Sequence, residues 1–257
     1  YGTQELCGTE FEIEFKNVSF KYPGAENYAL QNVNLKIKNG EHLAVVGRNG
    51  SGKTTFIKLM CRLYDVTDGE ILINGVNIKD YTKDSIIKLY SVVFQDFKIF
   101  SVSLKDNICA NSDFEGDRFY TCLENADIKE RTEHMPNKEN TYLYKDLDEN
   151  GVEISGGEAQ KLALARALYK DAPIVVLDEP TAALDPIAEN EIYTRFNTFV
   201  QGKTAIYISH RLSSCAFCDK IAVFNNAKLA ETGTHKDLLS AGGKYAELWN
   251  AQAKYYI

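Results

Sequence analysis

One segment constrains the fold of this 257-residue chain more than any other: Gly47-Arg48-Asn49-Gly50-Ser51-Gly52-Lys53-Thr54. It follows a short apolar run at 43–46, and after it apolar residues recur at helical spacing as far as Tyr64. A strand, a glycine-rich loop and a helix in this order form a phosphate-binding structure in α/β proteins. The sequence therefore predicts a phosphate loop between a buried strand and a helix.

The residue types in this loop match the chemistry of a nucleotide. Glycines let the backbone curl so that successive N–H groups converge on phosphate oxygens, and the helix that follows directs its positive end at them. Lys53 is expected to reach the β- and γ-phosphates, and the Thr54 hydroxyl to bind Mg²⁺. The expected nucleotide contacts in this segment are Gly47, Asn49, Gly50, Ser51, Gly52, Lys53, Thr54 and Thr55.

Two carboxylates follow the apolar run Ile174-Val175-Val176-Leu177, which we expect to be a buried strand. Asp178 is placed to hold Mg²⁺ through a water molecule. Glu179 comes next, and strand alternation points it in a different direction, where it would accept a proton from an attacking water as general base. A solvated acidic turn also explains the pair taken alone. Together with the phosphate loop, the pair predicts nucleotide hydrolysis.

The remaining pattern predicts an α/β fold with a mainly parallel sheet. Further strands are expected near residues 11–20, 33–37, 70–74 and 204–209, and helices near 158–169 and 187–200. The region from about 104 to 149 is polar and rich in Asn, Asp, Glu and Lys, and we expect it to form several short helices. This region therefore predicts an inserted helical subdomain.

Composition narrows the choice of partners and compartment. The net charge is −7 and no run of Lys or Arg is present, which argues against a nucleic acid as the main partner. Cys215 and Cys218 have C-x-x-C spacing without a second pair of ligands, so we expect reduced thiols in a reducing compartment. No stretch approaches the roughly 18 apolar residues that a membrane span needs.

A third motif, Ser155-Gly156-Gly157-Glu158, lies at the start of a predicted helix. Together with the phosphate loop and the acidic pair, it resembles the signature motif of ATP-binding cassette (ABC) ATPases. The usual form is Leu-Ser-Gly-Gly-Gln, whereas this chain has Ile154 and Glu158 at the first and last positions. We expect the extra negative charge of Glu158 near a triphosphate to weaken closure of the site.

The resemblance extends over nearly the whole chain and implies roles for four further residues. Tyr22 matches the aromatic residue that stacks on adenine, and Gln95 matches the glutamine that senses Mg²⁺ and couples to a membrane partner. Asp185 matches the loop that crosses to a partner subunit, and His210 the histidine that contacts the γ-phosphate. The implied catalytic residues are Lys53, Glu179 and His210, and the implied Mg²⁺ ligands are Thr54, Gln95 and Asp178.

The resemblance also implies a dimer. Two domains of this family pair head to tail, and each ATP lies between the phosphate loop of one copy and the signature residues of the other. Ser155, Gly156, Gly157 and Glu158 would therefore act on the ATP of a second copy. The implied fold is a P-loop NTPase (RecA-like) core with an N-terminal antiparallel β subdomain and the inserted α-helical subdomain.

Several features resemble the exporter branch of the family, among them the Tyr22-Pro23-Gly24 turn and Glu149-Asn150-Gly151 before the signature motif. We expect residues 1–257 to form one ABC domain, with its β subdomain and loop core at about 10–96, its helical subdomain at about 97–165 and the rest of its core at 166–257. The chain starts at Tyr1, so we expect a C-terminal part of a longer chain with a transmembrane domain, at the cytoplasmic face of the membrane.

Other functions stay open at this point. An importer ATPase carried as a separate subunit has the same core. A chromosome-maintenance or DNA-repair ATPase would carry long coiled coils, and the interval from Lys53 to Ser155 has no heptad repeat. A soluble ribosome-associated protein would carry two such domains and basic linkers. A binding module without catalysis is disfavoured because Lys53, Asp178, Glu179 and His210 are all present.

Overall fold

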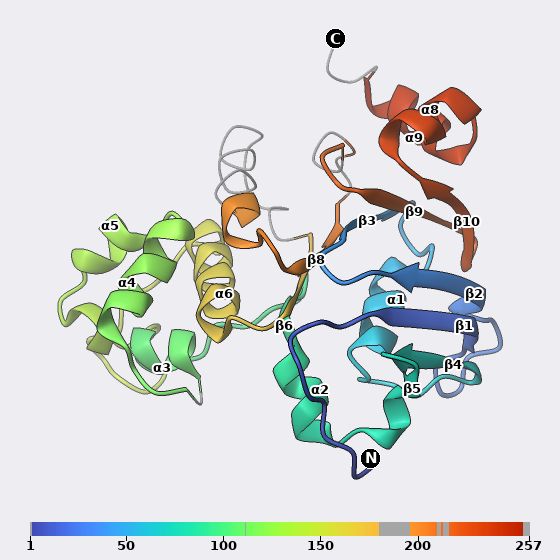
Figure 1. Cartoon of the computed structure of the whole chain (residues 1–257). Helices are drawn as coiled ribbons and strands as arrows, with labels where there is room; N and C mark the ends of the chain where they lie inside the picture. Colours follow the sequence, from blue (N-terminus) through green and yellow to red (C-terminus); the bar gives the residue numbers. More distant parts are fainter. Residues whose placement is uncertain (1, 111, 180–195, 210–211, 213–215, 254–257) are drawn as a thin grey trace. The chain divides into compact units, whose positions relative to one another are not determined.

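The computed structural model describes residues 2–110, 112–179, 196–209, 212 and 216–253 (Figure 1). These residues divide into two compact units. The first comprises Tyr1–Tyr90, Pro173–Asp178 and Gly202–Ile257, and the second comprises Ser91–Ala172 and Glu179–Gln201. Asp185 and His210, together with most of the helix expected at 187–200, lie outside the described residues.

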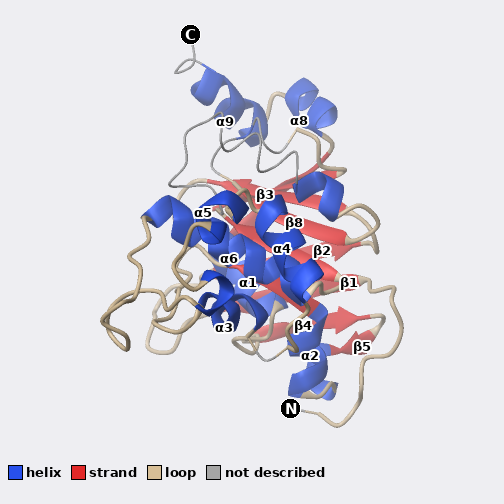
Figure 2. Ribbon diagram, turned by 90° about the vertical axis from the view of Figure 1, so that its left-hand side faces the viewer, coloured by secondary structure: helices blue, strands red, loops and turns tan. Residues whose placement is uncertain are grey.

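An antiparallel sheet forms the N-terminal part of the first unit (Figure 2). Its strands are β1 (Ile13–Phe20), β2 (Leu30–Ile37), β4 (Asp68–Ile73) and β5 (Val76–Asn77), in the order β2-β1-β4-β5. All three pairings are antiparallel. β4 and β5 are joined by Asn74 and Gly75, both at positive φ, which is the two-residue hairpin turn that Asn-Gly favours. The expected antiparallel subdomain is confirmed.

The second sheet carries the core of the same unit. Its strands within the unit are β3 (His42–Gly47), β7 (Ile174–Asp178), β8 (Thr204–Ile208), β9 (Lys220–Asn225) and β10 (Lys228–Gly233), in the order β10-β9-β3-β8-β7. The pairings are parallel except for the β9–β10 hairpin. Every residue of β7 and β8 is buried, which explains their continuous apolar runs. The mainly parallel sheet is confirmed.

Helix α1 connects the two sheets of the first unit. The ring of Phe56 stacks on Phe15 of β1 at a centroid distance of 4.5 Å and lies 5.4 Å from Phe224 of β9. Among the described residues, the helices of this unit include α1 (Lys53–Met60), a 3-10 turn at Ile78–Asp80, α2 (Lys83–Leu89), α8 (His235–Ala241) and α9 (Lys244–Ala253). Because Phe56 packs against one ring from each sheet, α1 and the loop before it are held firmly between them.

The second unit is helical in its described part. It contains α3 (Leu104–Cys109), α4 (Gly116–Asn125), α5 (Lys129–Glu133), a 3-10 turn at Lys138–Asn140 and α6 (Gly156–Lys170), preceded by β6 (Tyr90–Val93) at the boundary of the units. Phe119 of α4 and Tyr169 of α6 are fully buried, with an edge-to-face contact at 6.5 Å. The expected cluster of short helices is confirmed. Throughout the described chain, no helix has the length and apolar character for a membrane crossing.

Candidate nucleotide-binding site

The predicted phosphate loop runs from the end of β3 to the start of α1. Gly47, Gly50 and Gly52 all adopt positive φ, at 151°, 73° and 108°. The loop is folded back over Lys53, whose Nζ donates to the carbonyl oxygens of Gly47 at 3.0 Å and Arg48 at 3.2 Å. The loop backbone thus positions the Lys53 side chain, and its ammonium group lies next to the first two residues of the loop.

Close packing explains why glycine occupies two of these positions. A Cβ atom on Gly47 would lie 2.3 Å from the carbonyl oxygen of Phe224 and 2.6 Å from Ser51 Oγ. A Cβ on Gly52 would lie 2.6 Å from Leu30 Cδ2, in the neighbouring sheet. Gly50 has nothing within 4 Å and stays exposed. The loop is therefore fixed at both ends and open in the middle.

The Gly47→Ala variant should lose nucleotide binding and unfold more easily, because its new methyl group meets backbone that cannot move aside. The expected loss in the free energy of unfolding is about 1–3 kcal/mol beyond that of a control. Gly202→Ala is that control, since Gly202 also has positive φ but has open space around it. Denaturant unfolding of both variants measures the difference, and equal losses would contradict the packing argument.

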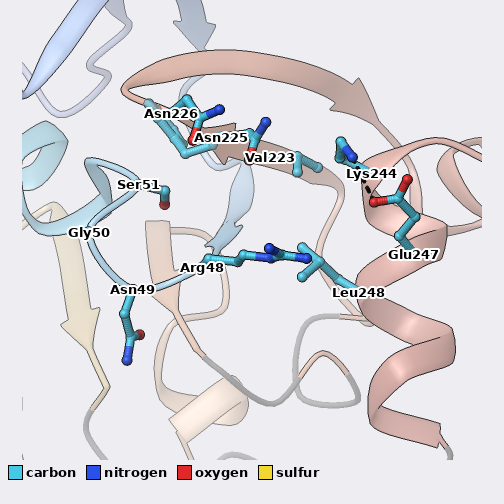
Figure 3. A pocket seen from close by; sticks show the side chains of 11 residues that line it. Arg48, Asn49, Gly50, Ser51, Val223, Asn225, Asn226, Lys244, Glu247 and Leu248 are labelled. Atoms are coloured by element: carbon cyan, nitrogen blue, oxygen red, sulfur yellow. Dashed lines mark hydrogen bonds and ion pairs between the residues drawn. The ribbon is translucent and has the colours of Figure 1, made fainter.

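The phosphate loop contains a buried hydroxyl that can form a hydrogen bond to a phosphate group. Ser51 is 4% exposed, and its Oγ has no hydrogen-bond partner among the described residues. A buried hydroxyl without a partner is costly, and a phosphate oxygen would satisfy it. Arg48, Asn49, Gly50 and Ser51 form one wall of a cavity of about 300 Å³, and Figure 3 shows Arg48 extending toward Leu248 of α9. The Arg48 guanidinium and the Ser51 hydroxyl on this wall can both donate to an anion.

Tyr22 lies beside the helix that follows the loop. Its hydroxyl is 3.1 Å from Oγ1 of Thr55, two positions after Lys53. Its ring makes edge-to-face contacts with Phe20 at 4.9 Å and Tyr64 at 5.3 Å. The structure thus brings Tyr22 to the same side of the unit as α1, while its stacking on adenine remains a prediction.

Asp178 lies at the carboxyl ends of the parallel strands, where the phosphate loop also begins. It is the last residue of β7 and is fully buried. Asp178 aligns with Ile208 of β8, and Ile208 in turn aligns with Val45 of β3, two residues before Gly47. Since these strands are parallel, their carboxyl ends share one edge. The prediction that Asp178 ends a buried strand at this edge is confirmed.

Glu179 departs from the pattern assumed in the sequence. Its backbone is left-handed, with φ at 53°, and its carbonyl oxygen accepts a 3.5 Å hydrogen bond from Nε2 of Gln160. Strand alternation holds only for extended backbone, so the turn and not the alternation sets the direction of the half-buried Glu179 side chain. Its role as general base remains a prediction.

The proposed Mg²⁺ ligands come from separate parts of the chain. Thr54 lies half-buried in the first turn of α1, and Asp178 is in the same unit. Gln95 is exposed and belongs to the other unit. Among the described residues, no group of three His, Cys, Asp or Glu side chains could hold a metal. A hydroxyl, a carboxylate and substrate phosphates still suit Mg²⁺, which keeps several of its waters.

The signature motif caps helix α6. Ser155 Oγ accepts a hydrogen bond from the Glu158 backbone N–H at 3.2 Å, and Glu158 Oε2 accepts one from the Ser155 N–H at 2.7 Å. This reciprocal pair is a capping box. Ser155 and Gly156 are exposed, and Gly157 is half-buried. The turn can therefore be reached by another molecule.

One residue that contacts the signature motif, Arg131, was not predicted from the sequence. Nε of Arg131 in α5 donates to the second oxygen of Glu158, Oε1, at 2.7 Å. Arg131 stands in a polar, highly charged stretch, so no pattern singles it out. Only the fold of the second unit brings it to the signature motif.

Comparison with known proteins identifies the family. The family model described as ABC transporter matches residues 30–182, more than half of the chain. The chain belongs to the ABC transporter family. It is accordingly an ATP-binding and ATP-hydrolysing domain, and the phosphate loop, acidic pair and signature motif stand on the elements expected for an ABC domain.

Relatives of this ABC domain are similar over nearly its whole length. It is 39% identical to the "ATP-dependent lipid A-core flippase" of Escherichia coli (strain K12), over 94% of the chain and 41% of the relative. It is 39% identical to "Subtilin transport ATP-binding protein SpaT" of Bacillus subtilis, over 92% of the chain and 39% of the relative. The ABC domain therefore spans well under half the length of these proteins.

A solved structure of the family has the same fold. "Structure of a bacterial Atm1-family ABC exporter with ATP bound" matches the ABC domain with a TM-score of 0.90 and 34% identity. The match covers 97% of the chain and 43% of the exporter. The expected P-loop NTPase fold is thereby confirmed, with its mixed sheet, its N-terminal antiparallel sheet and its helices.

Proposed function

We propose that this ABC domain hydrolyses MgATP at sites shared between two copies and thereby powers export through a transmembrane domain on the same longer chain. Relatives named as a flippase and an exporter support export over import. The coverage of those relatives supports a longer chain, because the domain matches less than half of each. The domain would then lie at the cytoplasmic face of the membrane.

The main support for a site shared between two copies is the exposure of the signature turn. Ser155 is exposed, and its hydroxyl accepts the capping hydrogen bond from the Glu158 N–H. Because the Ser155 side chain is exposed, its hydroxyl can meet an oxygen atom of another molecule. The N-terminus of the 15-residue helix α6 adds its positive end. The turn thus presents a second phosphate-binding surface in addition to the loop at Gly47–Thr54.

Each predicted residue has a role in this proposal. Lys53 and the loop bind the phosphates, and Tyr22 stacks on the base. Thr54, Asp178 and Gln95 would hold Mg²⁺, which when bound would neutralise charge on the phosphate oxygens. Glu179 takes the proton of the attacking water, His210 contacts the γ-phosphate and Asp185 contacts the partner copy. ATP joins the two copies, and loss of its γ-phosphate loosens them.

Complementation between two defective copies tests the shared site. Lys53→Met removes the phosphate loop's cation, and Ser155→Arg blocks the signature turn, so each variant alone is expected to be inactive. In a mixed dimer, one of the two shared sites contains neither change. An equimolar mixture should therefore recover about a quarter of the unchanged rate, because half of the dimers are mixed and one of their two sites is intact.

The concentration dependence of the unchanged domain provides the companion measurement. ATPase rate per molecule should rise with protein concentration and then level off as the dimer forms. A rate that stays constant down to nanomolar protein, together with no recovery in the mixture, would show that each copy works alone. The proposal would then be wrong.

A further inference from the structure

Glu158 is the one residue of the signature turn whose charge differs from the family's usual form. In the structure, both of its carboxylate oxygens have a partner. Oε2 accepts the Ser155 backbone N–H and Oε1 accepts Nε of Arg131, each at 2.7 Å. A glutamine could accept the Ser155 N–H through its own oxygen and would need no cation. A cation such as Arg131 is therefore needed beside a glutamate at this position but not beside a glutamine.

The surroundings make Arg131 the cation assigned to Glu158. The other basic side chains of the same groove pair elsewhere, Lys161 with Asp127 at 2.6 Å and Lys129 with Glu124 at 3.0 Å. The groove has a volume of about 810 Å³, and its charged or titratable lining residues are Glu124, Asp127, Lys129, Glu130, Arg131, Glu133, His134, Glu158 and Lys161. Carboxylates outnumber the basic side chains there. Removal of Arg131 would therefore leave a strongly negative patch beside the signature turn.

Glu158 keeps its charge in this setting. Burial raises the pKa of Glu158, but the hydrogen bonds from the Ser155 backbone and from Arg131 outweigh burial, and the net pKa lies below its usual value. The carboxylate is thus ionised at neutral pH. Its charge near a triphosphate is offset by the arginine and not by protonation.

We propose that Arg131 is a positioning residue for the signature turn, because it offsets the charge of Glu158 and so lets the turn accept the triphosphate of a second copy. This rests on the shared site proposed above. With Arg131 in place, Glu158 accepts the hydrogen bond of the Ser155 backbone N–H as a glutamine would, and its charge no longer repels phosphate. The weaker closure expected from the sequence is therefore cancelled by a residue of α5.

A double-mutant cycle tests the pairing. Arg131→Ala is expected to raise the KM for ATP and to weaken ATP-driven dimerisation by about three- to tenfold, since both side chains are partly exposed, at 40% and 25%. The effect should shrink at high salt, because screening weakens repulsion between Glu158 and phosphate. In a Glu158→Gln background, the same Arg131→Ala change should have little effect. Dimerisation is measured by sedimentation with MgATP, and KM by steady-state hydrolysis.

Lys161→Ala is the matched control, since it removes another cation and another ion pair from the same groove. It should leave KM within about twofold of the unchanged domain. Melting temperatures without nucleotide show whether Arg131→Ala acts through folding. An equal loss from Arg131→Ala in both backgrounds, or from Lys161→Ala, would overturn the proposal. An unchanged domain that works as independent monomers would instead overturn the shared site. The two failures are therefore distinguishable, because one appears in the unchanged domain and the other only in the variants.

Discussion

The Glu179→Gln variant is expected to bind ATP, hydrolyse it about 10²- to 10⁴-fold more slowly and accumulate as an ATP-bound dimer. Glutamine has nearly the shape of glutamate but cannot take a proton from the attacking water. Neither phosphate-binding surface is altered, because the Gly47–Thr54 loop and the Ser155 turn remain. Binding and assembly therefore continue while the step that separates the copies is lost.

Size-exclusion chromatography with MgATP measures this outcome directly. The variant should elute as a dimer with ATP and as a monomer without it, while single-turnover hydrolysis falls. Glu10→Gln is a suitable control, since Glu10 is exposed and remote in sequence from every predicted site residue. Hydrolysis at the unchanged rate would show that Glu179 is not the base, and a variant that remains monomeric with MgATP would contradict the expected dimer.

The sequence was sufficient wherever local chemistry determines structure. Residues 43–46 of β3 and 174–177 of β7 are apolar and buried, and each strand ends at the functional residue that the sequence predicted there. The hydrogen bonds from Lys53 to the loop at Gly47 and within the cap at Ser155 join residues only a few positions apart. Such short-range patterns specify phosphate loops and helix caps without knowledge of the rest of the fold.

Features that depend on distant residues were missed or misplaced. The helix expected to reach Tyr64 ends at Met60, because Arg62 is left-handed and donates to the carbonyl oxygens of Ile78 and Tyr81. The β9–β10 hairpin turns at Asn226 and Ala227, both at positive φ, and alanine gives no turn signal. In each case tertiary contacts override local preference.

The charge of Glu158 shows the same limit within the site. Considered along the sequence, an acidic residue in the signature motif predicts repulsion of a triphosphate. The fold supplies Arg131 from α5, whose Nε lies 2.7 Å from the carboxylate. An electrostatic expectation from sequence is therefore incomplete until the counterion, which lies far away along the chain, has been located in space.

The Lys53→Met variant is expected to lose ATP-dependent stabilisation and to hydrolyse ATP at least about 10²- to 10³-fold more slowly, because a preorganised cation at the phosphates is removed. Lys53 is 5% exposed, and its Nζ donates to Gly47 and Arg48 backbone oxygens. Methionine keeps much of the buried volume. It also relieves the cost of holding a cation away from water.

These opposing effects separate a ligand-binding lysine from a structural one. Without nucleotide, the melting temperature of Lys53→Met should stay close to that of the unchanged domain, whereas the rise that MgATP normally produces should vanish. Lys58→Met, on the same helix and half-buried, should retain the rise. A Lys53→Met domain that melts far lower without nucleotide and is still stabilised by MgATP would indicate that Lys53 serves the loop alone. Because a buried ammonium is costly in the free protein, its retention at this loop is best explained by the phosphates that it is expected to bind.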